Sequence, residues 1–577
     1  MQETGPRQLN NLVAELLNLS EPTPQQYADR MFTHPRDGWV FIRARVKGKG
    51  RVWIGVDEDT KEQALIAHSA TSPDTHEAMR FLPAGEHRLR VWQEGQAAVD
   101  SLVVRAIPEL LYCKLGYDPW IKPHGPYDWR FLQKHILPHV NVIIGNGTEE
   151  QRLLAAEAKK QGKRWLVEIH AGPYFQRLSA EDSYRYWVNT PGLKEPVYDG
   201  IIVDEFFGKD EDVYEAIIES VRRLRLSKEL RHKLFYPYCT NMFGARRSEE
   251  FIRAVTKLGH RFAWERYLPE PATEQEAKSL LMSRLTEDMH KWRRALPGCE
   301  RHMIVCFGFF EMIATSSLNI NPQVDYKVWL DMQFQHVATD PAFAGIYGLM
   351  GWTSGYADEE TLRWAARLYR HYGIEGKKEL LSEQYGFRFR PNHIDNPDFE
   401  EGVKGWTVQP AEAGSVEVRQ FEGYSWLQGR YPRTKRGNTF LCFKRSDKSP
   451  NTILQSIRNL QPGKLYSLKM VTADYRDLVE GRSVEQKHAV SCRIEGAVLL
   501  PERCFQVAVP NNYAHSLGPF NREHRFWMNY HYYVFHAKSR TAKLAISDWT
   551  GGNEPGGAVG QELMLNFIEV QPYLEET

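Results

Sequence analysis

Cysteine is scarce in this chain of 577 residues, and the seven cysteines form no CxxC pair and no regular series. A scattered, odd number argues against a disulfide framework and against a structural zinc site. Cys113, Cys239 and Cys306 lie inside apolar runs, where we expect small buried residues. Cys492 and Cys504 could still pair, so the sequence leaves one disulfide open.

Long apolar runs and an excess of charge are absent as well. No stretch of about 18 apolar residues occurs, so we expect no transmembrane helix. The formal net charge is +1, which gives no general attraction to nucleic acid or to an anionic membrane. Residues 1–5 are polar and lack the basic and apolar parts of a signal peptide. We expect a secreted or periplasmic protein in its mature form, with a cytoplasmic location as the alternative.

The N-terminal region changes its apolar period along the chain. Leucine and valine recur at helical spacing between Leu9 and Leu17, which predicts a helical segment in residues 1–20. From residue 38 the period becomes two. Strands are therefore expected at 39–46, 50–56, 78–82 and 88–92. Short strands at close spacing predict a β-sandwich domain over residues 21–107.

Residues 108–375 alternate between strand and helix patterns. Strands are predicted at 110–115, 140–145, 164–170, 200–205, 234–239, 261–267, 302–308 and 344–352. Helices are predicted at 129–137, 149–161, 180–188, 212–226, 248–258, 274–296, 326–338 and 359–372. Eight such pairs in about 265 residues match the size of a (β/α)₈ TIM barrel. A doubly wound open sheet is the alternative, but no GxGxxG turn follows the first strand.

The rest of the chain is rich in strand patterns. Residues 376–393 are polar and irregular, which is typical of a linker. Segments at 439–444, 465–472, 542–547 and 562–570 predict a β jelly-roll over residues 394–577. The expected fold class is therefore multidomain α/β, with a central barrel, an N-terminal β-sandwich and a C-terminal jelly-roll.

The fourth predicted barrel strand ends in two adjacent carboxylates, Asp204 and Glu205. Carboxylates are rarely buried without partners, and the carboxyl ends of barrel strands meet at the face where active sites lie. Other strand ends carry further candidates for this face: Asn146, Glu168, His170, Tyr238, Asn241, Trp264, Glu265, Tyr267, Glu311 and Trp352.

Carboxylates ringed by aromatic side chains are the residue types that glycosidic bond cleavage needs. One acid protonates the leaving oxygen, and another carboxylate attacks the anomeric carbon or activates water. Each residue also has a structural explanation: Asp204 and Glu205 could cap the next helix, and Glu265 could pair with Arg266. The joint pattern favours a site.

The barrel resembles the (β/α)₈ glycoside hydrolases of clan A, which have an Asn-Glu pair at the end of strand 4 and a Glu nucleophile at the end of strand 7. This resemblance implies that Glu205 is the acid/base, that Glu311 is the nucleophile with Glu265 in reserve, and that Trp352 is a sugar platform. Asp204 stands where the clan has Asn. The other substrate-binding candidates are Asp204, Glu168, His170, Asn146, Tyr238, Asn241, Trp264 and Tyr267.

The start of the last domain, Asn396-Pro397-Asp398-Phe399-Glu400, resembles the opening of carbohydrate-binding jelly-roll modules. Together the resemblances imply a glycoside hydrolase that acts on an oligo- or polysaccharide by a two-carboxylate mechanism, with retention of the anomeric configuration. A carbohydrate is the expected partner, and no cofactor or metal is expected.

Three alternatives remain open. The first is a non-catalytic carbohydrate-binding or scaffold protein with a degenerate barrel. The second is a metal-dependent hydrolase or lyase that uses Glu168, His170, Asp204 and Glu265, although no HxH or HExxH spacing supports it. The third is a chitinase-like barrel with DxxDxDxE, to which Asp199 and Asp204 conform but Ile202 and Phe206 do not.

Overall fold

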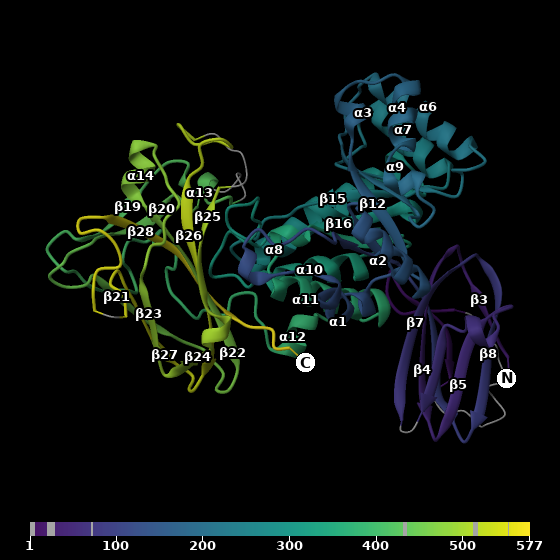
Figure 1. Ribbon diagram of the computed structural model, residues 1–577, viewed down its shortest axis with the longest axis horizontal. Coiled ribbons are helices and arrows are strands. Elements are labelled where there is room, and N and C mark those ends of the chain that lie inside the picture. Colours follow the sequence, from purple (N-terminus) through teal and green to yellow (C-terminus); the bar gives the residue numbers. More distant parts are fainter. Residues whose placement is uncertain are drawn as a thin grey trace.

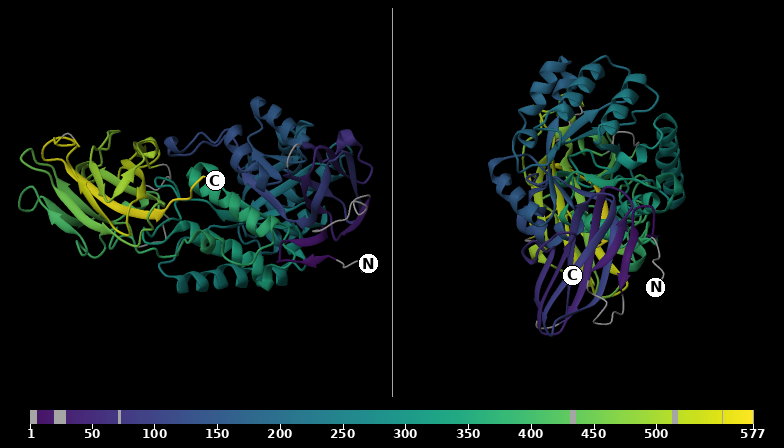
Figure 2. Two further views of the ribbon diagram at one scale, coloured as in Figure 1. Left: turned by 90° about the horizontal axis from the view of Figure 1, so that it is seen from below. Right: turned by 90° about the vertical axis from the view of Figure 1, so that its right-hand side faces the viewer.

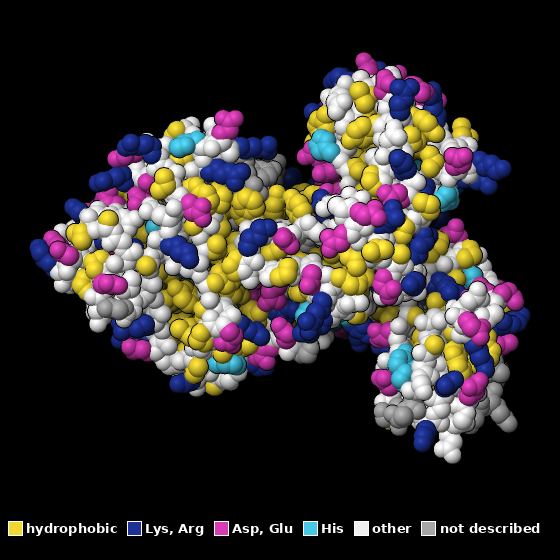
Figure 3. Space-filling model, viewed as in Figure 1, with side chains coloured by type: hydrophobic (Ala, Val, Ile, Leu, Met, Phe, Trp, Pro, Cys, Tyr) yellow, Lys and Arg dark blue, Asp and Glu magenta, His cyan; other side chains and the backbone are white. Residues whose placement is uncertain are grey.

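The computed structural model describes residues 6–19, 29–70, 73–430, 436–511, 517–551 and 553–576. A parallel barrel lies between two β-sandwiches, the N-terminal one in purple and the C-terminal one in green and yellow (Figures 1 and 2). The side chains of Lys and Arg and those of Asp and Glu are interspersed over the visible face (Figure 3). None of the described helices is long and apolar enough to cross a membrane.

The central domain is a closed barrel of eight parallel strands in chain order, which confirms the predicted fold. The strands are β10 (Glu109–Cys113), β11 (Val142–Gly145), β12 (Arg164–His170), β13 (Gly200–Phe206), β14 (Leu234–Cys239), β15 (Phe262–Arg266), β16 (Met303–Gly308) and β17 (Gly348–Trp352). Most of their residues are buried, because a barrel strand packs on side chains inside it and on helices outside it.

Helices follow the strands and form the outer layer. The longer ones are α1 (Trp129–His135), α2 (Glu149–Lys160), α4 (Ala180–Val188), α6 (Val213–Leu226), α7 (Arg246–Lys257), α8 (Glu274–Leu281), α9 (Glu287–Ala295), α10 (Tyr326–Thr339) and α11 (Glu359–Leu368). The short ones are α3 (Gly172–Phe175), α5 (Pro191–Lys194) and α12 (Leu381–Tyr385). Side-chain caps start several of them, as where Thr148 accepts from the Gln151 N–H and Asp358 from the Thr361 N–H.

The N-terminal sandwich packs two antiparallel sheets, of order β1-β2-β9-β4-β7 and β3-β8-β5-β6. Their strands are β1 (Arg7–Gln8), β2 (Ala14–Leu19), β3 (Arg30–His34), β4 (Gly38–Lys47), β5 (Gly50–Val56), β6 (Ile66–Ala70), β7 (Asp74–Leu82), β8 (Gly85–Gly95) and β9 (Ala98–Ile107). It covers the amino ends of the barrel strands: Trp39 Nε1 donates to Glu109 at 3.2 Å, and the Arg164 guanidinium lies 3.7 Å from the Phe81 ring centre.

The helical segment predicted in residues 1–20 is wrong for the part that the structure describes, residues 6–19. The segment forms β1 and β2, and β2 pairs with β9 across a bulge between Glu15 and Leu17. The bulge shifts the strand's alternation by one residue. Leu12 and Val13 pack with the barrel and Leu16 and Leu17 with the sandwich, so two contact surfaces produced the helix-like spacing. The sandwich thus begins before residue 21.

The C-terminal sandwich also has two antiparallel sheets, of order β18-β21-β27-β23 and β19-β20-β28-β22-β26-β24, with β25 paired to β26. The strands are β18 (Thr407–Gln409), β19 (Val416–Gln420), β20 (Thr439–Lys444), β21 (Thr452–Ile457), β22 (Leu465–Asp474), β23 (Ser491–Glu495), β24 (Ala497–Leu499), β25 (Phe505–Pro510), β26 (Trp527–Ala537), β27 (Ala542–Ser547) and β28 (Glu562–Pro572). Two short helices, α13 (Tyr424–Leu427) and α14 (Tyr475–Glu480), join strands. All seven cysteines are free thiols.

This sandwich packs on the loops that follow the barrel strands. Met312 and Ile313, after β16, share a buried apolar cluster with Tyr424 and Leu427 of the sandwich. The expected linker includes α12, and its residues Leu381 and Phe387 pack into the barrel's core. The two sandwiches therefore contact opposite ends of the barrel.

Candidate active site

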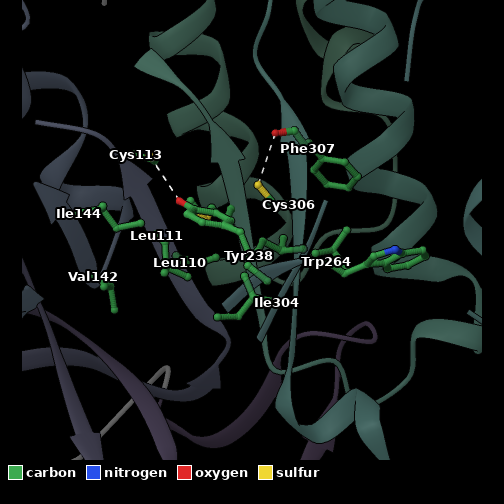
Figure 4. Packing of buried hydrophobic residues seen from close by; sticks show 14 of the residues in the cluster. Leu110, Leu111, Cys113, Val142, Ile144, Tyr238, Trp264, Ile304, Cys306 and Phe307 are labelled. Carbon is green, nitrogen blue, oxygen red and sulfur yellow. Dashed lines mark hydrogen bonds between the residues drawn. The ribbon is translucent and has the colours of Figure 1, made fainter. Parts of the chain in front are cut away.

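The first, third, fifth and seventh barrel strands contribute one layer of inward-facing side chains, Cys113, Glu168, Tyr238 and Cys306. The Tyr238 hydroxyl donates to Cys113 Sγ at 3.6 Å, and this sulfur lies 3.6 Å from Glu168 Oε2. Figure 4 shows Tyr238 between Cys113 and Cys306 in the barrel interior. Tyr238 is fully buried, so this expected substrate-binding residue forms the floor below the carboxyl ends of the strands.

Glu168 on this layer pairs with Lys114, which follows β10. Lys114 Nζ lies 2.7 Å from Glu168 Oε1, and 4.6 Å and 5.9 Å from the ring centres of Tyr117 and Trp352. Burial raises the pKa of Glu168, and the Lys114 charge opposes that rise. Burial lowers the pKa of Lys114, but the charge of Glu168 and its hydrogen bond, with smaller contributions from Cys113 and Tyr117, together outweigh burial, and the net pKa is raised.

Asp204 lies beside these residues at the end of β13. Burial raises its pKa to about 8, with further contributions from the charges of Glu265, Glu168 and Glu205. These three carboxylates come from the third, fourth and sixth strands. The chain therefore gathers like charges at one end of the barrel, and Asp204 keeps its proton near neutral pH.

Glu205 owes its position to a local distortion of β13. The pairing of β13 with β14 shifts between Val203 and Phe206, and Glu205 has φ +72°, a conformation that is uncommon outside glycine. Phe206 then packs among the outer aromatic residues Tyr214 and Phe251. The bulge thus leaves both Asp204 and Glu205 at the mouth of the barrel, which is the end where the carboxyl ends of its strands meet.

Glu205 has the most exposed side chain of the four carboxylates Glu168, Asp204, Glu205 and Glu265. It is 47% exposed, and its Oε2 lies 3.3 Å from Nε2 of His170. His170 stacks on Phe175, with ring centres 4.8 Å apart. His170 and Glu205 therefore form the rim of the mouth, as residues that can meet a bound molecule.

Glu265 faces the interior from β15. Burial raises its pKa to about 7; the Tyr267 hydroxyl, which donates to Oε1 at 2.8 Å, opposes the rise, and the charges of Glu205 and Glu168 add to it. The neighbouring Arg266 pairs with Asp288 at 3.2 Å. Glu265 thus holds a proton that is exchangeable near neutral pH.

Glu311, expected as the strand 7 nucleophile, lies outside this group. Its carboxylate contacts Lys469 of β22, which also lies 3.3 Å from Asp358 and 3.5 Å from Glu569. Burial and the Asp358 charge raise its pKa to about 8, although Lys469 opposes them. The chain leaves the barrel after Gly308, so Glu311 points beneath the C-terminal sandwich and away from the other carboxylates, and its role as nucleophile stays a prediction.

Trp264 and Asn241 also lie outside the mouth. Trp264 alternates with Glu265 on β15 and faces outward, where it packs against Trp292 of α9, and Figure 4 shows it pointing away from Tyr238. Its Nε1 donates to Asn241 Oδ1 at 2.8 Å, and Asn241 donates to Asp288. Both expected substrate-binding residues therefore hold the helix layer to the barrel.

The other expected residues stay near the carboxyl ends of the strands. Trp352 is half-buried and packs edge-on against Tyr238 at 5.1 Å. Tyr267 is half-buried and packs against Phe310 at 4.8 Å. Asn146 is exposed after β11, where its backbone N–H donates to Gln151 Oε1 at 2.7 Å.

Three residues of this region were not among the expected site residues. Lys114 is the cation of the group, and Tyr117 and Phe175 have exposed aromatic rings, 37% and 47% respectively. Lys114 lies within the predicted strand 110–115, so the sequence already placed it at a strand end. Tyr117 and Phe175 follow β10 and β12 within about five residues, and a wider window after each strand end would have included these two rings.

The geometry gives no support to a metal centre at the mouth. Within the described ranges, Glu168, His170, Asp204 and Glu265 do not bring three ligand atoms within 4.8 Å of one another.

The similarity of this chain to known proteins is structural. No family model matches it, and no curated protein matches it. Solved structures that align with it include β-glucuronidase 2 from Bacteroides uniformis (10% identity, 99% of this chain and 80% of that one, TM-score 0.32). They also include a β-galacturonidase from Eisenbergiella tayi (11%, 59% and 68%, 0.32) and a chitinase-like agglutinin from Robinia pseudoacacia (10%, 45% and 99%, 0.32). These TM-scores are low, so the function of this chain has to be argued from its own residues.

Proposed function

We propose that the carboxyl end of the barrel hydrolyses a glycosidic bond of an oligo- or polysaccharide. The observation that carries this proposal is the convergence of Asp204, Glu205 and Glu265 from two strands, with the pKa of Asp204 raised to about 8 and that of Glu265 to about 7. Glycosidic cleavage needs one carboxyl group that holds a proton and one that does not.

Glu265 is the proposed proton donor. Tyr267 occupies its Oε1, which leaves Oε2 for the leaving oxygen of the scissile bond. Glu205, on the rim beside His170, is the second carboxylate. It either attacks the anomeric carbon or removes a proton from the attacking water, and the two routes give retention and inversion respectively. This assignment exchanges the roles that the resemblance implied for these two residues.

Asp204 and the aromatic residues supply binding in this proposal. A protonated Asp204 can donate a hydrogen bond to a sugar hydroxyl, which is a role that an Asn amide could also fill. The rings of Tyr117, Phe175 and Trp352 present faces on which a sugar ring can stack. Lys114 orients Glu168 and limits the negative charge below the sugar.

The test is hydrolysis of a panel of oligosaccharides by Glu265→Gln and Glu205→Gln, with Glu150→Gln as a control on the exposed face of α2. We expect kcat/KM to fall by at least about 10³-fold in both site variants, and to stay within about twofold in the control. The alkaline limb of the wild-type pH profile, near pH 7, should disappear in Glu265→Gln. Near-normal activity of either folded site variant would refute the assignment, and NMR of the released anomer distinguishes the two routes.

A non-catalytic carbohydrate-binding protein is the second candidate. It is favoured by the burial of Glu311, which leaves the end of β16 without an accessible carboxylate, and by a cavity of about 710 Å³ beside the C-terminal sandwich. Tyr385, Arg388, Arg458 and Arg540 line this cavity. Binding of panel sugars by calorimetry, without release of reducing ends, would favour this candidate over hydrolysis.

A further inference from the structure

Three polar residues of the N-terminal sandwich stand where its strands should carry apolar side chains. Directly opposed residues of antiparallel strands point to the same face of a sheet. Asp74 and His76 on β7 oppose Val46 and Ala44, and His68 on β6 opposes Val52. Val46, Ala44 and Val52 are all fully buried between the sheets.

The three side chains therefore enter the space between the two sheets from two different edges. β6 ends one sheet and β7 ends the other. The rings of His68 and His76 have their centres 3.8 Å apart and are tilted by 34° to each other, and His76 Nε2 lies 3.5 Å from Asp74 Oδ2. The potential ligand atoms of His68, Asp74 and His76 all lie within 4.8 Å of one another.

One ring nitrogen of His76 has no hydrogen-bond partner among the described residues. The Nε2 atom of His76 is buried and accepts no hydrogen bond from the described residues. The side chain of Asp74 is 56% exposed, so an ion and water can reach the group.

We propose that His68, Asp74 and His76 bind a divalent transition metal ion, with Zn²⁺ as the preferred ion. The bound ion joins the edges of the two sheets. Two imidazole nitrogens and one carboxylate oxygen are ligands that Zn²⁺ accepts, and a fourth position remains for water. Ca²⁺ and Mg²⁺ prefer sets of oxygen ligands. Inward-pointing polar residues can also serve only to protect a sheet edge from pairing, and that role requires no metal.

The experiment uses the full chain, dialysed against EDTA and then into chelator-free buffer, and titrated with ZnCl₂ in a calorimeter. We expect one equivalent of Zn²⁺ to bind, and its loss in the double variant His68→Gln/His76→Gln. His232→Gln, at an exposed histidine elsewhere, is the matched control and should bind as the wild type does. CaCl₂ should give no comparable heat.

Two further measurements keep the test decisive if the double variant folds poorly. Asp74→Asn changes an exposed side chain and should weaken Zn²⁺ binding by about tenfold while leaving the far-ultraviolet circular dichroism unchanged. Co²⁺ should give visible absorption bands in the wild type that are absent in His76→Gln. The proposal is overturned if the wild type binds no Zn²⁺ below about 100 µM, or if the folded double variant binds it with unchanged stoichiometry and affinity.

Discussion

Lys114 and Lys469 each lie among several carboxylates, yet only one of these two clusters is open to solvent. The Lys469 cluster, with Glu311, Asp358 and Glu569, is closed between the barrel loops and the C-terminal sandwich, and each of its side chains is at most 7% exposed. The Lys114 cluster, with Glu168, Asp204, Glu205 and Glu265, lies at the barrel mouth and includes a 47% exposed carboxylate. Two clusters of similar residue composition therefore differ in their access to solvent.

Each cluster contains an ion pair and a carboxyl group with a raised pKa, and the difference lies in the balance between the two. In the closed cluster, burial raises the pKa of Asp358, but the charges of Lys469 and His124 and the hydrogen bonds from Thr361 together outweigh burial, and the net pKa is lowered. The lysine thus holds a charged partner and ties two domains together. In the open cluster, burial and mutual repulsion raise the pKa of Asp204 and Glu265, so that protons, which can move, replace fixed countercharges. Movable protons suit catalysis, and fixed ion pairs suit assembly.

Substitution of the two lysines should distinguish the two clusters most clearly. Lys469→Met leaves Asp358 and Glu569 buried without their cation, and we expect a loss of about 3–5 kcal/mol in the free energy of unfolding. Lys114→Met should cost only about 1 kcal/mol, because Glu168 can take up a proton in its place. Urea unfolding of both variants at pH 7 provides the measurement. Equal losses would show that the clusters do not differ in this way.

Asp204→Asn tests the open cluster through the pH dependence of stability. The pKa of Asp204 is near 3.8 in the unfolded chain and about 8 in the folded one. Between these values the folded state binds more protons, so the free energy of unfolding falls as pH rises. Asn removes this effect, and we expect a gain of about 1–3 kcal/mol at pH 8 that vanishes near pH 4.

The control for this variant is Asp182→Asn, at an exposed position in the first turn of α4. It should leave the pH dependence of unfolding unchanged. A loss of stability in Asp204→Asn at pH 8 would mean that the native carboxylate is ionised and well paired, contrary to the proton-holding role.

Much of the barrel could be predicted because its strands and helices differ in period. Runs such as that of β13 are buried on both sides and bounded by polar residues, so eight of them could be counted. The β2 strand could not be predicted from the sequence. Its pairing with β9 and its bulge depend on contacts between residues far apart in the chain, and these contacts outweigh the helical spacing of its apolar residues. Tertiary contacts decide such short segments.

The site was predictable only as far as alternation could be followed along each strand. Glu168, Asp204 and Glu265 lie within strands, and their inward direction follows from the period of two. Glu311 lies beyond the end of β16, where the path of a loop decides its direction. One signal was present: Lys469 interrupts the apolar run of β22, and a buried lysine needs buried carboxylates.

Glu311→Gln is the smallest expected change and separates the two clusters directly. The raised pKa of Glu311 means that Glu311 is the protonated member of the closed cluster. Asp358 is the ionised partner of Lys469. A Gln amide has nearly the same shape as the protonated acid, so we expect a loss of at most about 1 kcal/mol in unfolding free energy. Hydrolysis by this variant, if the barrel mouth is the active site, should stay within about twofold of the wild type. A loss of about 10³-fold in a folded Glu311→Gln variant would instead restore the strand 7 nucleophile that the resemblance implied, and would require the loop after β16 to move Glu311 from Lys469 into the mouth.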